Sequence, residues 1–185
     1  MKVLGCIIAG GKSSRMGRDK ALMEWRGKPL IEHVATRLAP QVDRLVINAN
    51  SDAEQFAFLN FAVIADRLEI ATPVAGLHAA LSYAAEQGFD AVLTTPCDSP
   101  LLPIDLRERL HGPGAAIAMS AGQPHYLTGF WPVSTVALFE PPTLRRVMDF
   151  ADAAKARHVE WNASGLDPFT NLNTPEDLAS LLEIP

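Results

Sequence analysis

Short, almost uninterrupted runs of apolar residues recur along the chain. Such runs predict strands that are buried on both faces, because a strand with one solvated face would alternate polar and apolar residues. The runs lie at residues 3–8, 44–48, 61–65, 91–95 and 115–119. The first of them leads into Ala9-Gly10-Gly11, where a tight loop is expected.

Between these runs, apolar residues return at helical spacing. The segment 29–39 opens with Pro29, a residue that suits the first turn of a helix, and the alanine-rich segment 73–87 stops at Gly88. Strands that alternate with helices predict a parallel sheet that is covered on both faces. The sequence therefore predicts the α/β class, with a single three-layer α/β/α domain and a mostly parallel, Rossmann-like sheet.

The second half of the chain has a less regular pattern. Residues 124–132 and 157–161 are expected to form strands. Helices are expected around 134–139 and 142–151, and a final helix opens at Thr174, whose hydroxyl can cap it. No repeat or linker interrupts the chain, so residues 1–185 are expected to form one domain.

The composition of the chain argues against several classes of function. Of the 185 residues, 48% are hydrophobic and 20% are charged, which excludes wholesale disorder. A net charge of −5 argues against nucleic acid or an anionic membrane as the main partner. No apolar run approaches a membrane span, the start of the chain lacks a signal-peptide pattern, and the two cysteines have no zinc-ligand spacing. A cytoplasmic protein without a nucleic-acid or membrane partner is expected.

The loop after the first strand is the strongest candidate site. Two adjacent glycines let backbone N–H groups approach an anion closely, and four cations follow within nine residues. This pattern predicts phosphate binding, although a solvated basic loop is the alternative. The loop is not a Walker sequence, because Cys6 stands where the first glycine should be, and the dinucleotide pattern fails as well. The residues concerned are Gly10, Gly11, Lys12, Arg15, Arg18 and Lys20.

Two aspartates follow other predicted strands. Asp66 comes after the run 61–65, and Asp98 comes after the run 91–95. Ligands of open α/β sheets bind beyond the carboxyl ends of the strands, so both carboxylates are expected at that edge, where Asp98 could hold Mg²⁺. An Asx turn or the cap of a helix near Pro103 is the alternative reading of Asp98. His125, before a possible substrate strand, is a further candidate for substrate contact.

Taken together, these segments resemble a known family. The stretch 8–20 resembles the signature loop of nucleotidyltransferases that act on small phosphorylated molecules. The further segments narrow the resemblance to the molybdenum cofactor guanylyltransferases, and they appear in that family's order. They are Gly27–Leu30, Asn48–Asn50, Thr72–Gly76, Pro96–Asp98 and Asn171–Leu178.

The resemblance implies a sheet of the nucleotidyltransferase type and a reaction. GMP would pass from GTP to the molybdopterin cofactor, giving molybdopterin guanine dinucleotide and pyrophosphate with Mg²⁺ as cofactor. The N-terminal part would bind GTP, and the C-terminal part would face the pterin. It also implies exchange with molybdenum-insertion and cofactor-carrier proteins.

The resemblance also implies roles for individual residues, each at the position of this sequence that matches the family's motif. The resemblance implies catalytic roles for Arg15, Lys20 and Asp98, with Asp98 as the metal ligand. The implied GTP-binding residues are Ile8, Ala9, Gly10, Gly11, Lys20, Asn48, Asp66 and Asp98, and Asn171 and Asn173 would face the pterin.

Two alternatives stay open at this point. A nucleotidyltransferase could use CTP or another small phosphorylated acceptor, and a nucleotide-binding module could have lost turnover. The pair Gly10-Gly11 resembles the guanine-using branch more than the cytidine-using one. Two departures concern the acceptor side: Thr72 stands where the family has glycine, and the segment 124–131 follows the family pattern only loosely.

Overall fold

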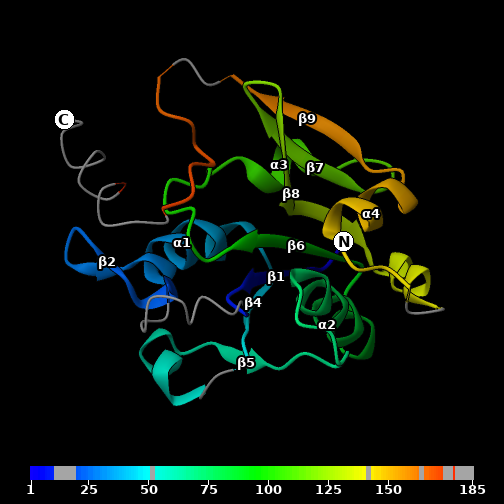
Figure 1. Cartoon of the computed structure of the whole chain (residues 1–185), viewed down its shortest axis with the longest axis horizontal. Helices are drawn as coiled ribbons and strands as arrows, with labels where there is room; N and C mark the ends of the chain where they lie inside the picture. Colours follow the sequence, from blue (N-terminus) through cyan, green and yellow to red (C-terminus); the bar gives the residue numbers. More distant parts are fainter. Residues whose placement is uncertain (11–19, 51–52, 141–142, 163–164, 173–176, 178–185) are drawn as a thin grey trace.

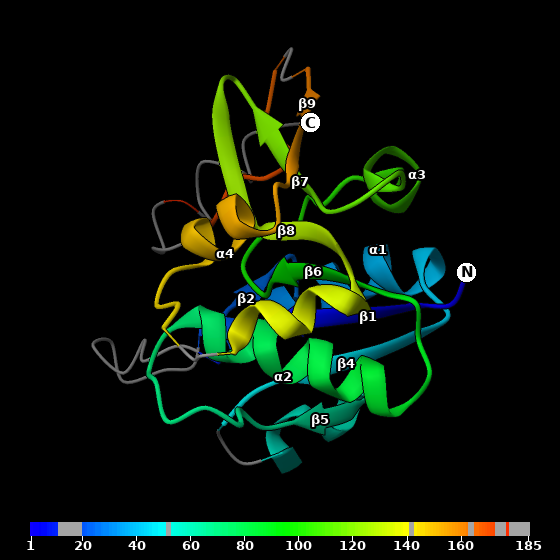
Figure 2. The same ribbon diagram turned by 90° about the vertical axis from the view of Figure 1, so that its right-hand side faces the viewer.

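A seven-stranded sheet forms the centre of the computed structural model, which describes residues 1–10, 20–50, 53–140, 143–162, 165–172 and 177 (Figure 1). The strand order across the sheet is β5-β4-β1-β6-β8-β7-β9. The strands are β1 (Val3–Ile8), β4 (Arg44–Asn48), β5 (Ala62–Ile64), β6 (Ala91–Pro96), β7 (Ala116–Ser120), β8 (Gln123–Pro132) and β9 (Arg157–Trp161). The two outermost strands, β5 and β9, lie at the bottom and the top of Figures 1 and 2.

Most neighbouring strands of this sheet are parallel. β1 pairs in parallel with β4 and β6, β4 pairs in parallel with β5, and β7 does so with β9. β8 is antiparallel to both of its neighbours, β6 and β7. The prediction of a mostly parallel sheet is confirmed, and β8 is the strand of this sheet that departs from it.

Helices cover both faces of the sheet. They are η2 (Lys20–Leu22), α1 (Leu30–Leu38), η3 (Ala39–Gln41), η4 (Ala53–Leu59), α2 (Pro73–Glu86), α3 (Leu106–Leu110), η5 (Val133–Phe139) and α4 (Val147–Ala153), where η marks a 3₁₀ helix. Val3 and Ile7 of β1 belong to one buried cluster, together with residues of α1 and α3. Leu4 and Ile8 belong to a second cluster, together with residues of α2, η5 and α4. Because successive side chains of a strand point to opposite faces, the two clusters confirm the three-layer arrangement.

The predicted elements mostly match those observed, with three differences. α4 begins at Val147 rather than at residue 142, because Arg146 has an extended backbone (φ −124°, ψ 146°). A short hairpin of β2 (Glu24–Trp25) and β3 (Lys28–Pro29) precedes α1 and was not predicted. The segment predicted as a helix at 134–139 is the 3₁₀ helix η5. The final helix predicted from Thr174 falls almost wholly outside the described residues. Within the described part of the chain, no helix has the length and hydrophobicity that a membrane crossing requires.

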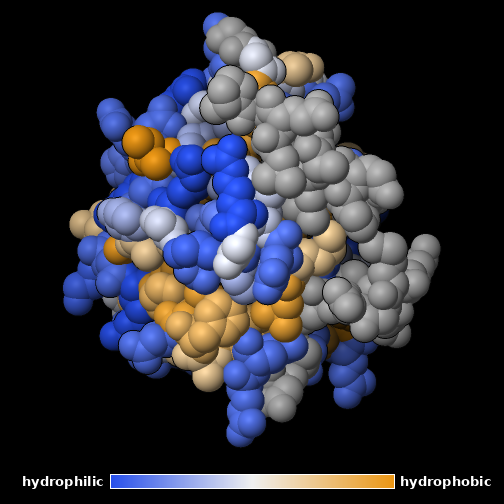
Figure 3. Space-filling view, turned by 90° about the vertical axis from the view of Figure 1, so that its left-hand side faces the viewer, coloured by the Kyte–Doolittle hydropathy of each residue, from blue (hydrophilic) through white to orange (hydrophobic). Residues whose placement is uncertain are grey.

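The carboxyl ends of the parallel strands β1, β4, β5 and β6 share one edge of the sheet. β1 and β6 run toward the side of the molecule that Figure 3 turns to the viewer. The described surface on that side is mainly hydrophilic, with its largest hydrophobic patch below the centre of the view. This is the edge at which open α/β sheets bind their ligands.

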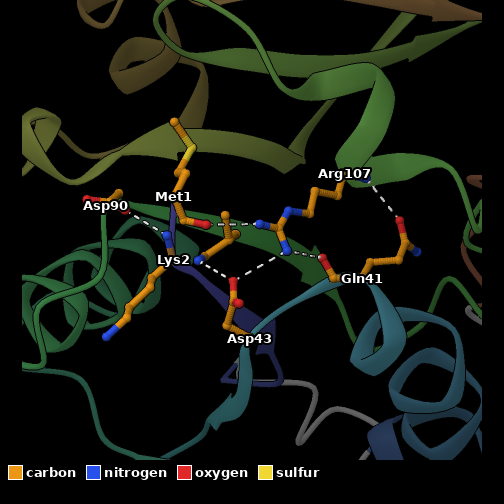
Figure 4. A network of polar contacts seen from close by, with 7 residues as sticks. Met1, Lys2, Gln41, Asp43, Asp90 and Arg107 are labelled. Atoms are coloured by element: carbon orange, nitrogen blue, oxygen red, sulfur yellow. Dashed lines mark hydrogen bonds and ion pairs between the residues drawn. The ribbon is translucent and has the colours of Figure 1, made fainter.

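A network of polar contacts closes the opposite edge, where β1 begins (Figure 4). The N–H of Val3 donates to Asp43 Oδ2 at 2.7 Å, and the N–H of Lys2 donates to Asp90 Oδ2 at 2.6 Å. Arg107, on α3, forms an ion pair with Asp43 at 3.3 Å. The network therefore ties the first strand to a helix at the edge away from the candidate site.

Candidate active site

One group of polar side chains lies where β4 and β5 end. Asn48 Nδ2 donates to Asp66 Oδ1 at 2.9 Å and to the carbonyl oxygen of Ile64 at 3.3 Å. Asn50 Nδ2 donates to Asp66 Oδ2 at 2.6 Å, and its own carboxamide oxygen accepts from the N–H of Asp66 at 2.9 Å. Both oxygens of Asp66 thus accept hydrogen bonds from asparagines, and Asn48 is fully buried. The arrangement fixes the carboxamides of these two asparagines at the edge of the sheet.

Two glycines make room for the side chain of Asn48. A Cβ on Gly10 would lie 3.3 Å from Asn48 Oδ1, and a Cβ on Gly76, in α2, would lie 2.2 Å from the same atom. The N–H of Ala9 donates to the carbonyl oxygen of Asn48 at 2.8 Å, so the backbone that leaves β1 is held against β4. Asn48 Oδ1 is buried and has no hydrogen-bond partner among the described residues. A buried acceptor of this kind is a position at which a donor from water or a ligand is expected.

A second group surrounds the end of β6. Lys20 Nζ forms an ion pair and hydrogen bond with Asp98 Oδ2. The other carboxylate oxygen, Oδ1, is buried, and no described residue is its hydrogen-bond partner; Asp98 is 8% exposed. The N–H of Cys97 donates to the carbonyl oxygen of Ile8 at 3.2 Å, which joins this group to the end of β1. The structure therefore brings a cation and a carboxylate, both expected at the site, into direct contact.

The chain near residue 171 returns to the same place. Ser99 Oγ donates to Asn171 Oδ1 at 2.8 Å, and the N–H of Leu172 donates to the carbonyl oxygen of Asp98 at 2.9 Å. Asn171 was expected to face a second substrate, and it lies beside the residue after Asp98. The two contacts join residues more than 70 positions apart in the sequence.

A cavity of about 280 Å³ opens next to Asp98. Its lining comes from the end of β6, from β8 and from the segment near residue 170: Pro96, Asp98, Ser99, Pro124, His125, Tyr126, Leu127, Thr128, Phe169 and Asn171. The imidazole of His125 packs against the ring of Phe169, with centroids 4.7 Å apart. Burial lowers the pKa of His125 below its ordinary value, although the nearby Asp167 and Glu160 act in the opposite direction.

The expected site residues that the structure describes fall into these groups. Ile8, Ala9, Gly10, Asn48 and Asp66 lie around the ends of β1, β4 and β5, and Lys20, Asp98 and Asn171 lie around the end of β6. The expected residues Gly11, Lys12, Arg15, Arg18 and Asn173 fall outside the described residues. Sequence reasoning did not assign roles to Asn50 and Gly76, although both stand inside the motifs on which the resemblance rests. No local signal marks Ser99, whose contact with Asn171 depends on the fold.

The chemistry of these groups suits a phosphorylated substrate. Lys20 supplies a positive charge, and the unpartnered oxygen of Asp98 is a hard carboxylate donor of the kind that Mg²⁺ prefers. Within the described ranges, no three His, Cys, Asp or Glu side chains gather into a metal cluster. Mg²⁺ is commonly held by one or two carboxylates together with substrate phosphates, and Asp98 fits such a site.

Comparison with known proteins agrees with this chemistry. The family described as "MobA-like NTP transferase domain" matches residues 5–160. The molybdenum cofactor guanylyltransferase of Rhodobacter capsulatus is 44% identical, over 97% of this chain and 94% of that protein. The enzyme of the same name from Rhizobium leguminosarum bv. trifolii is 41% identical, over 96% of this chain and 90% of that protein.

Solved structures share the fold. A putative protein from Aquifex aeolicus has a TM-score of 0.75 and 26% identity, covering 92% of this chain and 93% of that one. Molybdopterin-guanine dinucleotide biosynthesis protein A from Archaeoglobus fulgidus has a TM-score of 0.69 and 23% identity, covering 97% and 96%. The sequence match extends over nearly the whole chain and over the strands that carry the site. The protein is therefore a nucleotidyltransferase that belongs to the MobA-like NTP transferase family.

Proposed function

We propose that this enzyme transfers GMP from GTP to the molybdenum-bearing molybdopterin cofactor and releases pyrophosphate, with Mg²⁺ as its metal cofactor. The names of the relatives at 41–44% identity support the two substrates. The observation that carries the proposal is the contact of Lys20 with Asp98 beside a cavity that Asn171 also lines. Joining two phosphorylated substrates requires a cation, a carboxylate that binds the metal, and a cavity that can hold the second substrate beside the first.

GTP would bind at the ends of β1, β4 and β5. Ile8, Ala9 and Gly10 would line its pocket, and the buried carboxamide of Asn48, held by Asp66, would offer an acceptor oxygen to it. Gly11 and Arg15 are proposed for the same substrate on the resemblance alone. In this proposal residues 1–185 form a single domain, with the nucleotide on the N-terminal part and the pterin on the C-terminal part.

The reaction needs positioning and charge neutralisation more than proton transfer. The attacking group is a terminal phosphate that is already anionic, so no strong general base is required. Lys20 would leave Asp98 and pair with the phosphates of GTP, reducing the repulsion between the two anions. Asp98 is the residue that would hold Mg²⁺, and the chemistry that the metal would supply there is neutralisation of phosphate charge.

The cavity beside Asp98 is the proposed site for the acceptor. Ser99 and Asn171 line it together with Asp98, so an acceptor phosphate placed there would lie near Asp98. Asn173 is proposed for the same substrate by its place in the motif. This assignment places the two substrates on either side of the carboxylate.

Pyrophosphate release tests the proposal. The purified protein is incubated with Mg²⁺, each of the four NTPs in turn, and molybdopterin cofactor. We expect pyrophosphate release with GTP but with none of the other three NTPs, and only when the cofactor is present. Release with CTP, or with a sugar phosphate in place of the cofactor, would instead establish one of the alternative substrates. GTP binding without release in any mixture would contradict the proposed reaction.

Paired variants connect the result to the site. Asp98→Ala should abolish release, whereas Asp152→Ala, which removes an exposed carboxylate on α4, should leave it unchanged. Circular dichroism confirms that both variants are folded. Full activity of Asp98→Ala would remove Asp98 from the proposed metal site.

A further inference from the structure

A chain of hydrogen bonds behind the cavity determines which nitrogen of His125 carries a proton. Ser120 Oγ donates to Asp167 Oδ2 at 2.7 Å, and it lies 2.6 Å from His125 Nε2. A serine hydroxyl has one hydrogen to give, and the Asp167 carboxylate, which only accepts, takes it. The contact with His125 must therefore be a donation from Nε2–H to Ser120 Oγ.

This assignment leaves Nδ1 as the unprotonated nitrogen. Burial lowers the pKa of His125, and the charged groups that oppose this shift are Asp167 and Glu160. A neutral ring at physiological pH then has one donor, Nε2–H, and one acceptor, Nδ1. The donor is used by Ser120, which is fully buried.

We propose that Ser120 and Asp167 are positioning residues that hold His125 as the Nε2–H tautomer, so that Nδ1 accepts a hydrogen bond from an N–H group of the acceptor substrate. His125 lines the cavity and its ring packs against that of Phe169 at an angle of 31°, so the ring lies beside whatever occupies the cavity. The inference rests on the proposed function only in taking the occupant to be the acceptor.

Because Nδ1 is a hydrogen-bond acceptor, the substrate group beside it must be a hydrogen-bond donor. A phosphate oxygen has no proton to donate at neutral pH and would need a protonated, cationic histidine. A nitrogen heterocycle with ring N–H or amino groups is the complementary partner for a neutral Nδ1. His125 would therefore recognise the heterocyclic end of the acceptor, and the phosphate end would lie toward Asp98.

The variant Asp167→Asn gives a test that needs no substrate. Asp167 Oδ1 accepts from the N–H of Phe169 at 2.9 Å, so an asparagine there would keep its oxygen on Phe169 and turn its NH₂ toward Ser120. Ser120 would then have to donate to His125 Nε2, which requires the Nδ1–H tautomer. Nitrogen-15 NMR of the imidazole distinguishes the two tautomers directly.

The expected spectra are Nε2–H for His125 in the parent protein and Nδ1–H in Asp167→Asn. An Nδ1–H ring in the parent protein, or an unchanged tautomer in a folded Asp167→Asn, would overturn the proposal. Thr94→Val serves as the matched control, because it removes another buried hydroxyl, one that accepts from Trp131 Nε1 at 2.8 Å. It should leave the His125 spectrum unchanged.

Kinetics then connect the tautomer to the substrate. Loss of one hydrogen bond corresponds to about a tenfold rise in the KM for the acceptor in Asp167→Asn, with the KM for GTP unchanged. Equal rises in both KM values, or none in either, would overturn the role in acceptor recognition. If the parent protein does not transfer GMP at all, the proposed function fails, and the NMR result still stands as a separate test of the positioning residues.

Discussion

The carboxamide of Asn48 occupies the space in which a side chain on Gly76 would stand. A Cβ at Gly76 would lie 2.2 Å from Asn48 Oδ1, which is shorter than a Cβ tolerates, and 3.0 Å from Asn48 Cγ, which is tighter than most Cβ contacts. Gly76 is in the first turns of α2, and Asn48 ends β4. The absence of a side chain on the helix is therefore a condition for the orientation of Asn48 and, through it, of Asp66.

The substitution Gly76→Ala tests this relationship. In a helix interior alanine normally stabilises by about 1 kcal/mol relative to glycine. Here the added methyl group must displace Asn48, so we expect a loss of about 1–3 kcal/mol in the free energy of unfolding. Because Asn48 would lose its bond to Asp66, we also expect the KM for GTP to rise about tenfold. Denaturant titration and steady-state kinetics measure the two effects.

Ser82→Ala is the matched control on the same helix. Its hydroxyl makes a long contact, 3.4 Å, with His78, so the substitution should change neither stability nor the KM for GTP appreciably. A Gly76→Ala variant that is more stable than the parent and uses GTP normally would show that Asn48 moves without cost.

The strands of the sheet could be predicted because a strand that is buried on both faces is almost entirely apolar in sequence. Almost uninterrupted apolar runs identified β1, β4, β5 and β6, and the rule for parallel sheets then placed Asp66 and Asp98 at a common edge. The structure agrees, since Ile8 contacts residues from both neighbouring strands. Thr72, the departure from the family glycine, has φ −139°, an extended conformation open to any residue, so glycine is not required there.

Contacts between distant segments could not be predicted in the same way. The bond from Ser120 to Asp167 joins β7 to a loop 47 residues later, and neither residue belongs to a motif. The pairing of Lys20 with Asp98 spans 78 residues, and it brings η2 to the end of β6. Sequence pattern and spacing indicate local structure and burial, whereas these two side-chain contacts depend on how the whole fold packs.

The pair of Lys20 and Asp98 predicts coupled effects on stability. Lys20→Met would leave Asp98 largely buried with neither oxygen bound to a cation, at a cost of about 1–3 kcal/mol in the free energy of unfolding. Asp98→Asn should also destabilise. The double variant should lose less than the sum of the two, because removing both charges leaves no uncompensated one.

Chemical denaturation of the four proteins gives the coupling energy directly. A control cycle uses Arg37→Met in place of Lys20→Met. Arg37→Met removes a hydrogen bond to the carbonyl oxygen of Leu102 at 3.1 Å. Its loss of stability should add to that of Asp98→Asn. Additive losses in the Lys20 cycle itself would mean that the ion pair contributes nothing to the folded state. All variants that lack Lys20 or Asp98 should lose GMP transfer.

The network at the start of β1 predicts how stability depends on acid. The N–H of Val3 donates to Asp43, and Arg107 lies beside it, so the pKa of Asp43 is lowered below its ordinary value. A carboxyl group whose pKa is lower in the folded state stabilises the fold above its unfolded pKa of about 4. That contribution is lost as the pH falls through the folded-state pKa, because both states are then protonated.

The substitution Asp43→Asn removes the charge and should therefore destabilise the protein at pH 6 but make progressively less difference below pH of about 4. Since the Asp43 side chain is 45% exposed, solvent screens its ion pair and the difference at pH 6 should be small. Urea titration at a series of pH values measures it, with Glu69→Gln as a control at an exposed carboxylate outside the network. A difference between parent and Asp43→Asn that stays constant from pH 6 down to pH 3 would mean that the charge of Asp43 does not hold the first strand in place.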